Sequence, residues 1–133
     1  MNAQDCDADP VAAFQVNGVG SARLRLAANR AGVRRIIYFS TAHVYRSPLV
    51  GTITEDCCTL NLHPYAKSHL AGESALYSYP DLTGPETLVL RMSNAFGAPL
   101  HPSANCWGLL ANDLCKQAVL TRSLRLSTSG WHL

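Results

Sequence analysis

A short apolar run that ends in two hydroxyl side chains constrains the fold of this chain more than any other feature. The run Ile36–Phe39 has no polar break, and Ser40 and Thr41 follow it directly. A continuous run of this kind is typical of a strand that is covered on both faces of a parallel sheet. The sequence therefore predicts a buried strand over residues 33–39 that delivers a hydroxyl pair at its carboxyl end.

Helical and strand patterns alternate along the rest of the chain. Asp9 is a capping residue before Pro10, apolar residues follow at three- and four-residue spacing, and Gly32 can end the helix, which together predict a helix over 10–31. Similar patterns predict helices over 64–79 and 107–120, strands over 87–92 and 124–126, and loops over 43–62 and 97–105. Such alternation indicates an α/β fold with parallel strands joined by right-handed crossovers.

The composition excludes several classes of protein. The chain has 133 residues, of which 47% are hydrophobic and 15% charged, as in a globular domain. No run approaches the roughly 18 apolar residues of a membrane span, and the polar start of the chain does not resemble a signal peptide, so we expect a cytoplasmic protein without a membrane partner. A net charge of +2 is too small to indicate a nucleic-acid partner.

The cysteines and histidines do not form a metal-binding pattern. The five cysteines contain no CxxC pair, and the five histidines contain no HExxH or HxH arrangement. The sequence therefore predicts no metal site, and the thiols are expected to be reduced.

The helix predicted after residue 63 presents Tyr65 and, four residues later, His69. Positions four apart lie on the same face of a helix, whereas Lys67 projects to a different face. A phenol titrates at about 10, so it needs a nearby cation to act as a base at neutral pH. An imidazole, with a pKa of about 6.5, supplies that charge only in part at pH 7, although it can donate a hydrogen bond to a hydroxyl group.

Five segments in series resemble the extended short-chain dehydrogenase/reductases, the NAD-dependent epimerase/dehydratase family that acts on nucleotide sugars. They are Val16–Ser21 (like VNxxGT), Ala31–Thr41 (like AGVKRFVYFSS), Thr54–Asp56 (TED), Pro64–Glu73 (like PYxxSKxxGE) and Leu90–Pro99 (like LRxxNxxGP). Agreement between several independent signals supports the resemblance. It implies a portion of a Rossmann-type doubly wound parallel sheet, in the order helix–strand–helix–strand–helix–strand.

The resemblance also implies a chemistry and a set of site residues. Family members oxidise a hydroxyl of a nucleotide sugar by hydride transfer to NAD or NADP. The aligned hydroxyl of Thr41 binds the reacting sugar oxygen, Tyr65 is the acid/base, and His69 stands where the family has a lysine that also holds the nicotinamide ribose. The implied catalytic residues are Thr41, Tyr65 and His69; the cofactor-binding residues are Asn17, Ser40, Tyr65, His69 and Ser93; the substrate-binding residues are Thr41 and Asn94.

This chain departs from the family pattern in two ways. It has His69 in place of the lysine, and it contains no glycine-rich phosphate loop, because Gly18-x-Gly20 lacks a third glycine and a preceding strand. We therefore expect residues 1–133 to form a single partial NAD(P)-binding domain, the catalytic half, with a substrate-binding region starting over about 97–133.

Two alternatives to an epimerase/dehydratase-type enzyme stay open. One is an inactive fragment or pseudoenzyme, and the other is a binding or regulatory module; a homodimer is also open. The absence of a GxSxG elbow argues against a hydrolase that uses Ser40. If His69 must be cationic in catalysis, activity should fall with rising pH, and a His69→Lys variant should lose that dependence.

Overall fold

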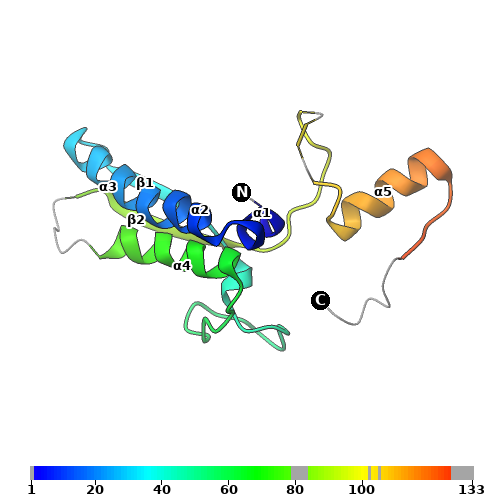
Figure 1. Cartoon of the computed structure of the whole chain (residues 1–133), viewed down its shortest axis with the longest axis horizontal. Coiled ribbons are helices and arrows are strands. Elements are labelled where there is room, and N and C mark those ends of the chain that lie inside the picture. The colour runs from blue at the N-terminus through cyan, green and yellow to red at the C-terminus, as the bar shows by residue number, and fades with distance from the viewer. Residues whose placement is uncertain (1, 79–83, 102, 105, 127–133) are drawn as a thin grey trace. The chain divides into compact units, whose positions relative to one another are not determined.

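A computed structural model describes residues 2–78, 84–101, 103–104 and 106–126 of the chain (Figure 1). The chain divides into two compact units, Met1–Ser93 and Asn94–Leu133. In the described part, none of the helices has the length and apolar character needed to cross a lipid bilayer.

Two parallel strands form the sheet of the first unit. Strand β1 (Arg35–Thr41) pairs with β2 (Glu86–Met92), in a register that runs from Arg35 opposite Glu86 to Thr41 opposite Met92. The helix α4 (Pro64–Tyr77) lies between them in the sequence. The predicted parallel α/β arrangement is therefore confirmed, and so is the position of the hydroxyl pair, Ser40 and Thr41, at the carboxyl end of its strand.

The helix predicted over 10–31 is present with an irregular middle. It consists of α2 (Pro10–Phe14), a π-helical turn η1 (Gln15–Val19) and α3 (Gly20–Arg30). Gly32, with a φ of 66°, follows its end, in a conformation that glycine adopts without strain. A further short helix, α1 (Ala3–Ala8), which the sequence patterns did not predict, begins at a capping box formed by Asn2 and Asp5.

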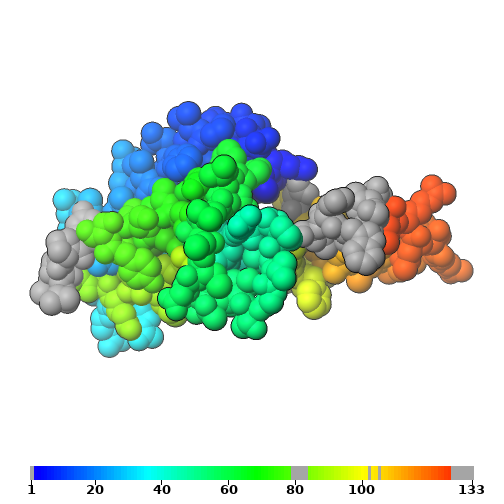
Figure 2. All heavy atoms as spheres, turned by 90° about the horizontal axis from the view of Figure 1, so that it is seen from below, coloured from blue at the N-terminus to red at the C-terminus, as the bar shows by residue number. Residues whose placement is uncertain are grey.

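The helices α3 and α4 pack on the same face of the two strands. Ala28 of α3, Ile36 of β1 and Leu76 of α4 form the core, and Tyr38 packs against them. The helix α4 also contacts α2 and η1, so it lies against the N-terminal helices in the space-filling view (Figure 2). This packing fixes the face of α4 that lies beside the carboxyl end of β1.

The prediction that the strand is covered on both faces is wrong for this chain. On the face opposite α3 and α4, Ile37 is 51% exposed, Phe39 63%, and Leu88 and Met92 46% each. The continuous apolar run has the composition of a strand between two layers of helices, but in the described residues helices cover only one of its faces.

The second unit contains one regular element in its described part, the helix α5 (Leu110–Thr121). It begins later than predicted because residues 106–109 form a turn, which the Leu109 N–H closes by donating to the Cys106 carbonyl at 3.3 Å. The strand predicted over 124–126 is absent. The Gln117 side chain binds the backbone N–H and carbonyl of Arg125 instead, at 2.7 and 3.2 Å, and so uses groups that a strand would need for pairing.

Candidate active site

The hydroxyl pair at the end of β1 is buried and engaged. Ser40 is 5% exposed and Thr41 is 4% exposed. The Ser40 hydroxyl donates to Glu73 Oε1 of α4 at 2.5 Å. Thr41 Oγ1 accepts the His43 N–H at 3.2 Å, which caps the short 3-10 helix η2 (Ala42–Val44). Ser40 therefore ties the strand to α4, whereas the Thr41 hydroxyl keeps its own proton for a further contact.

Tyr65 and His69 lie together on one face of α4, as their spacing predicted. The helix begins after His63, whose Nδ1 accepts the Tyr65 N–H at 3.1 Å, and Pro64 occupies its first turn. The Tyr65 and His69 ring centroids are 4.7 Å apart, with the rings edge to face at 68°. Among the described residues, the Tyr65 hydroxyl makes no hydrogen bond, so it is open to a ligand.

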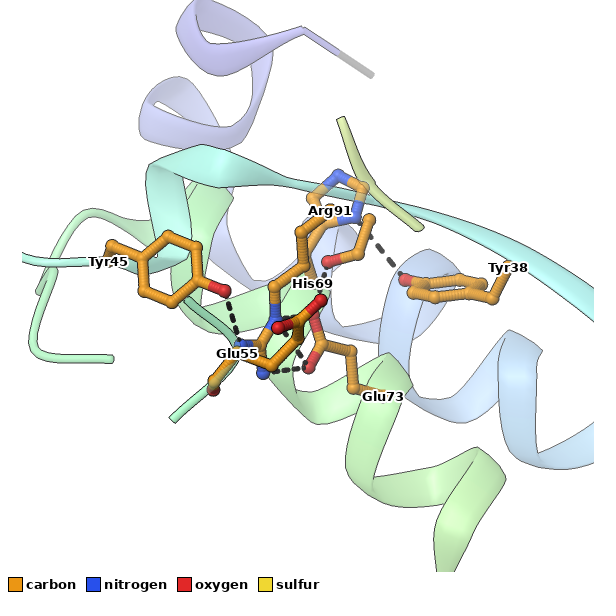
Figure 3. Close-up of polar contacts among 7 residues, drawn as sticks. Tyr38, Tyr45, Glu55, His69, Glu73 and Arg91 are labelled. Atoms are coloured by element: carbon orange, nitrogen blue, oxygen red, sulfur yellow. Dashed lines mark hydrogen bonds and ion pairs between the residues drawn. The ribbon is translucent and has the colours of Figure 1, made fainter. Parts of the chain in front are cut away.

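His69 is half-buried between α4 and β1. Its Nδ1 lies 3.4 Å from the Tyr38 hydroxyl (Figure 3). Burial lowers the pKa of His69 below its usual value, and the nearby Glu73 carboxylate opposes that shift only in part. The ring is therefore mainly neutral at pH 7, so it does not supply the fixed positive charge of a lysine.

The lowered pKa of His69 makes the stability of the chain depend on pH. The unfolded chain binds a proton to this imidazole at about pH 6.5, and the folded chain does so only at lower pH. The free energy of unfolding should therefore fall as the pH drops below about 6.5. Urea unfolding at several pH values should show a weaker fall in a His69→Gln variant than in a control in which the exposed His101 is changed to Gln. Equal pH dependence in the two variants would contradict the assignment.

An ion pair between a half-buried arginine and a buried glutamate joins the elements of the site (Figure 3). Arg91, at the end of β2, binds the Glu73 carboxylate with Nη2–Oε2 at 2.7 Å and Nε–Oε1 at 3.1 Å. The Arg91 guanidinium also donates to the Tyr45 hydroxyl at 2.9 Å and to the Glu55 carbonyl at 3.3 Å. The hydrogen bonds to Glu73 raise the pKa of Arg91 further above its usual value, and the guanidinium keeps its charge. The pair holds α4 against the carboxyl ends of both strands.

Asn17 lies in the π turn and faces α4. Its amide Nδ2 donates to Ser68 Oγ at 3.0 Å, and Ser68 donates in turn to the Tyr65 carbonyl at 3.0 Å. Gly18 lies beside Ala71, where an added Cβ would come within 3.3 Å of the Ala71 Cβ. Small residues therefore let the π turn approach α4 closely, and π turns are frequent at functional sites. Asn17 is therefore linked through the Ser68 hydroxyl to the backbone of Tyr65, in the first turn of α4.

Two cavities adjoin these residues. One of about 200 Å³ is lined by Tyr65 together with His43, Asn61 and His63. A larger one of about 590 Å³ lies beside Arg91 and is lined by Tyr45, Glu73 and Tyr77 among others. The smaller cavity includes Tyr65 and the larger one does not, whereas neither cavity is lined by His69 or Thr41.

Five of the predicted site residues lie on adjoining elements. Ser40 and Thr41 end β1, Tyr65 and His69 lie in α4, and Asn17 lies in the π turn that contacts α4. Ser93 is the last residue of the first unit and Asn94 the first of the second; both are exposed, and their cofactor and substrate roles stay predictions.

Four further residues contact the predicted site residues or hold their elements together, and the sequence patterns did not predict a role for them: Tyr38, Ser68, Glu73 and Arg91. Two of them stand inside the motifs, Glu73 in Pro64–Glu73 and Arg91 in Leu90–Pro99. Their opposite charges, each placed next to a predicted site element, are the signal that could have identified the ion pair.

The sequence and the fold match known proteins along most of the chain. The NAD dependent epimerase/dehydratase family matches residues 2–123. A UDP-glucose 4-epimerase from Azospirillum brasilense is 34% identical over 124 residues, which cover 91% of this chain and 36% of that protein. A UDP-glucose 4-epimerase from Rhizobium leguminosarum bv. trifolii is 29% identical over 99 residues, 74% of this chain and 30% of that protein.

Among solved structures, the NAD dependent NDP-hexosamine 5,6-dehydratase TunA, involved in tunicamycin biosynthesis, has a similar fold. The TM-score is 0.78 at 21% identity, and the match covers 98% of this chain and 41% of that one. The chain spans about a third of the length of the two epimerases, 36% and 30%. The predicted partial Rossmann-type fold therefore has a structural counterpart.

Proposed function

Because the chain belongs to the NAD dependent epimerase/dehydratase family, we propose that it carries the catalytic strand and helix of an NAD(P)-dependent enzyme that acts on a nucleotide sugar. One observation carries the proposal most directly. The ring centroids of Tyr65 and His69 lie 4.7 Å apart on the face of α4 beside β1, and the Ser40–Glu73 hydrogen bond holds the strand end against the same helix. An acid/base group and a hydroxyl-bearing strand end are thus held on one rigid support, as catalysis requires.

The proposed roles follow from the groups that remain available. The Tyr65 hydroxyl, unbonded among the described residues, exchanges a proton with a hydroxyl of the sugar. The Thr41 hydroxyl binds the reacting oxygen, because Oγ1 accepts from the backbone while its proton is free to donate. His69 stands one helical turn after Tyr65, where the family has its lysine. Its role is to orient the ligand hydroxyl that binds beside it.

The residues present fit one end of a nicotinamide cofactor. His69 and Tyr65 offer polar groups beside the strand end, where open α/β sheets place their ligands. Ser40 and the Asn17 side-chain amide are engaged inside the protein, and no glycine-rich turn in this sequence is available for a pyrophosphate. When bound, the cofactor would supply the hydride acceptor. His69 and Tyr65 would hold its ribose.

A second candidate function is a module that binds a ligand without turning it over. The observation that favours it is the lowered pKa of His69, which removes the positive charge that would activate Tyr65 at neutral pH. The two candidates differ in their response to His69→Lys. Restored charge should raise turnover of a nucleotide sugar if catalysis is intact, and should leave a binding module inactive.

Cofactor binding by the purified chain tests the proposal. Titration with NADH, NADPH and reduced nicotinamide mononucleotide, followed by nicotinamide fluorescence, should show saturable binding with a Kd no weaker than about 1 mM. The mononucleotide should bind nearly as well as NADH, because Tyr65 and His69 would hold only the nicotinamide ribose. Tyr65→Phe should weaken binding, whereas Tyr77→Phe, at an exposed position of the same helix, should not. Failure of all three ligands to saturate would overturn the proposal.

A further inference from the structure

The helix α4 begins with a histidine side chain as its cap. His63 Nδ1 accepts the Tyr65 N–H at 3.1 Å, and the His63 carbonyl accepts the Lys67 N–H at 3.0 Å. The usual caps are oxygens of serine, threonine, aspartate or asparagine, whereas an imidazole nitrogen accepts only while the ring is neutral. We propose that His63 is a positioning residue for Tyr65, and that it releases the first turn of α4 when its ring is protonated.

The tautomer of His63 follows from its partner. A backbone N–H can only donate, so the Nδ1 that receives it carries a lone pair, and the single proton of the neutral ring lies on Nε2. A second proton would go onto Nδ1, where it would face the Tyr65 N–H. Pro64, at the first position of the helix, has no N–H, so the Tyr65 amide is the first donor of α4 and loses this acceptor when the ring is charged.

The same cap connects Tyr65 to the end of β1. The His63 N–H donates to Asn61 Oδ1 at 2.9 Å, and the Asn61 N–H donates to the carbonyl of Val44, in η2, at 3.4 Å. Because η2 follows Thr41 directly, these contacts run from the strand end through the loop to the first turn of α4. His63, Asn61 and Tyr65 also line the cavity of about 200 Å³. Protonation of His63 would therefore loosen the connection between the strand end and Tyr65.

The groups that face the His63 ring act on its charged form in opposite directions. Nε2 lies 3.9 Å from Oδ1 of Asp7 in α1, and this carboxylate attracts the charged ring. The His63 and Asp7 side chains are 42% and 72% exposed, so water screens their attraction. The N–H groups at the start of α4 repel a positive charge. The Tyr65 phenol and His43 line the same cavity, and His43 repels the ring when both imidazoles are protonated.

The release of the cap should follow the pH. An imidazole changes its charge between about pH 5 and 8, so the Tyr65 N–H should be bonded to His63 at pH 8 and released at pH 5. Ligand binding by Tyr65 should weaken over the same range, and this consequence alone rests on the proposed function. The tests of the cap need no ligand, so a failure of the cap and a failure of the proposed function are separate results.

Nitrogen-15 NMR measures the ring and the amide in one labelled sample. The His63 ring signals, identified by their loss in His63→Asn, should show the proton on Nε2 at pH 8. Between pH 8 and 5 the Tyr65 amide proton should move upfield, as expected when a hydrogen bond is lost, with the same midpoint as the His63 ring. A ring protonated on Nδ1 at pH 8, or a Tyr65 amide that does not follow the His63 ring, would overturn the proposal.

Two variants separate the titration of His63 from its cap. His63→Asn keeps an acceptor that does not titrate in this range, so the Tyr65 amide should lose most of its pH dependence. His63→Ala has no acceptor, so the Tyr65 amide proton should be upfield already at pH 8 and should exchange with solvent roughly fivefold faster than in His63→Asn. His43 and His69, whose ring centroids lie 6.1 and 4.7 Å from that of Tyr65, are kept in both variants and give the common background. Wild-type pH dependence of the Tyr65 amide in His63→Asn would contradict the role of His63, even if cofactor binding is confirmed.

Discussion

An Arg91→Leu variant is expected to lose about 3–5 kcal/mol of its free energy of unfolding, the usual cost of leaving a buried charge without its partner. Glu73 is 5% exposed, and its carboxylate binds Arg91 through both oxygens while it accepts from Ser40. Without Arg91, the negative charge of Glu73 stays in a site shielded from water. Urea denaturation followed by circular dichroism measures the loss.

The matched control is the exposed pair on the same two strands. Arg35 binds Glu86 at 2.8 Å, but these side chains are 61% and 68% exposed, so Arg35→Ala should cost no more than about 1 kcal/mol. The double variant Arg91→Leu/Glu73→Leu should recover much of the loss, because it removes both charges together. A loss in Arg91→Leu as small as that in Arg35→Ala would show that the pair does not hold α4 to the strands.

A Gly72→Ala variant is expected to be the second most damaging substitution, with a loss of at least about 1–3 kcal/mol from overpacking. An alanine normally stabilises a helix relative to glycine by roughly 0.5–1 kcal/mol. Here its Cβ would overlap the Tyr38 hydroxyl and lie 2.6 Å from the Asn17 carbonyl. A backbone carbonyl cannot turn away as a side chain can, so the π turn and α4 must separate. Thermal unfolding measures the effect.

Gly20→Ala provides the control for this steric argument. Its Cβ would meet only the Gln15 carbonyl, at an ordinary 3.6 Å, so the variant should be stabilised by helix propensity. Adding Tyr38→Phe to Gly72→Ala should restore only part of the stability, because it removes the hydroxyl but leaves the Asn17 carbonyl, at 2.6 Å, and the ring carbon Cζ of residue 38, at 2.8 Å, in place. A Gly72→Ala chain as stable as the wild type would mean that α4 and the π turn lie farther apart than described.

The sequence was a good guide where local patterns decide the structure. Pro64 in the first turn and the spacing of Tyr65 and His69 were enough to predict one face of α4, and the hydroxyl pair lies at the strand end as expected. Asp9 before Pro10 and the glycine at 32 correctly bounded a helix to within a few residues. These features depend on capping, backbone conformation and helical periodicity, which neighbouring residues determine.

The sequence was a poor guide where distant residues decide the structure. The lowered pKa of His69 depends on its burial, and the His69 Nδ1 lies 3.4 Å from the hydroxyl of Tyr38, which is 31 positions away in the sequence. The Glu73–Arg91 pair joins two elements that no local pattern connects, and the exposed face of Ile37 and Phe39 depends on which layers pack on the sheet. The strand predicted over 124–126 failed because a helix side chain, Gln117, binds the backbone there.

The central claim is that the face of α4 bearing Tyr65 and His69, together with the end of β1, is the ligand site of this chain. The measurement that tests it most directly is chemical-shift mapping of the nitrogen-15-labelled chain during titration with NADH. We expect saturable shifts that concentrate at the amides of residues 40–43 and 65–69 and at the His69 ring, and a Tyr65→Phe variant should reduce them. Saturable shifts confined to other parts of the chain, or none at all up to millimolar NADH, would contradict it.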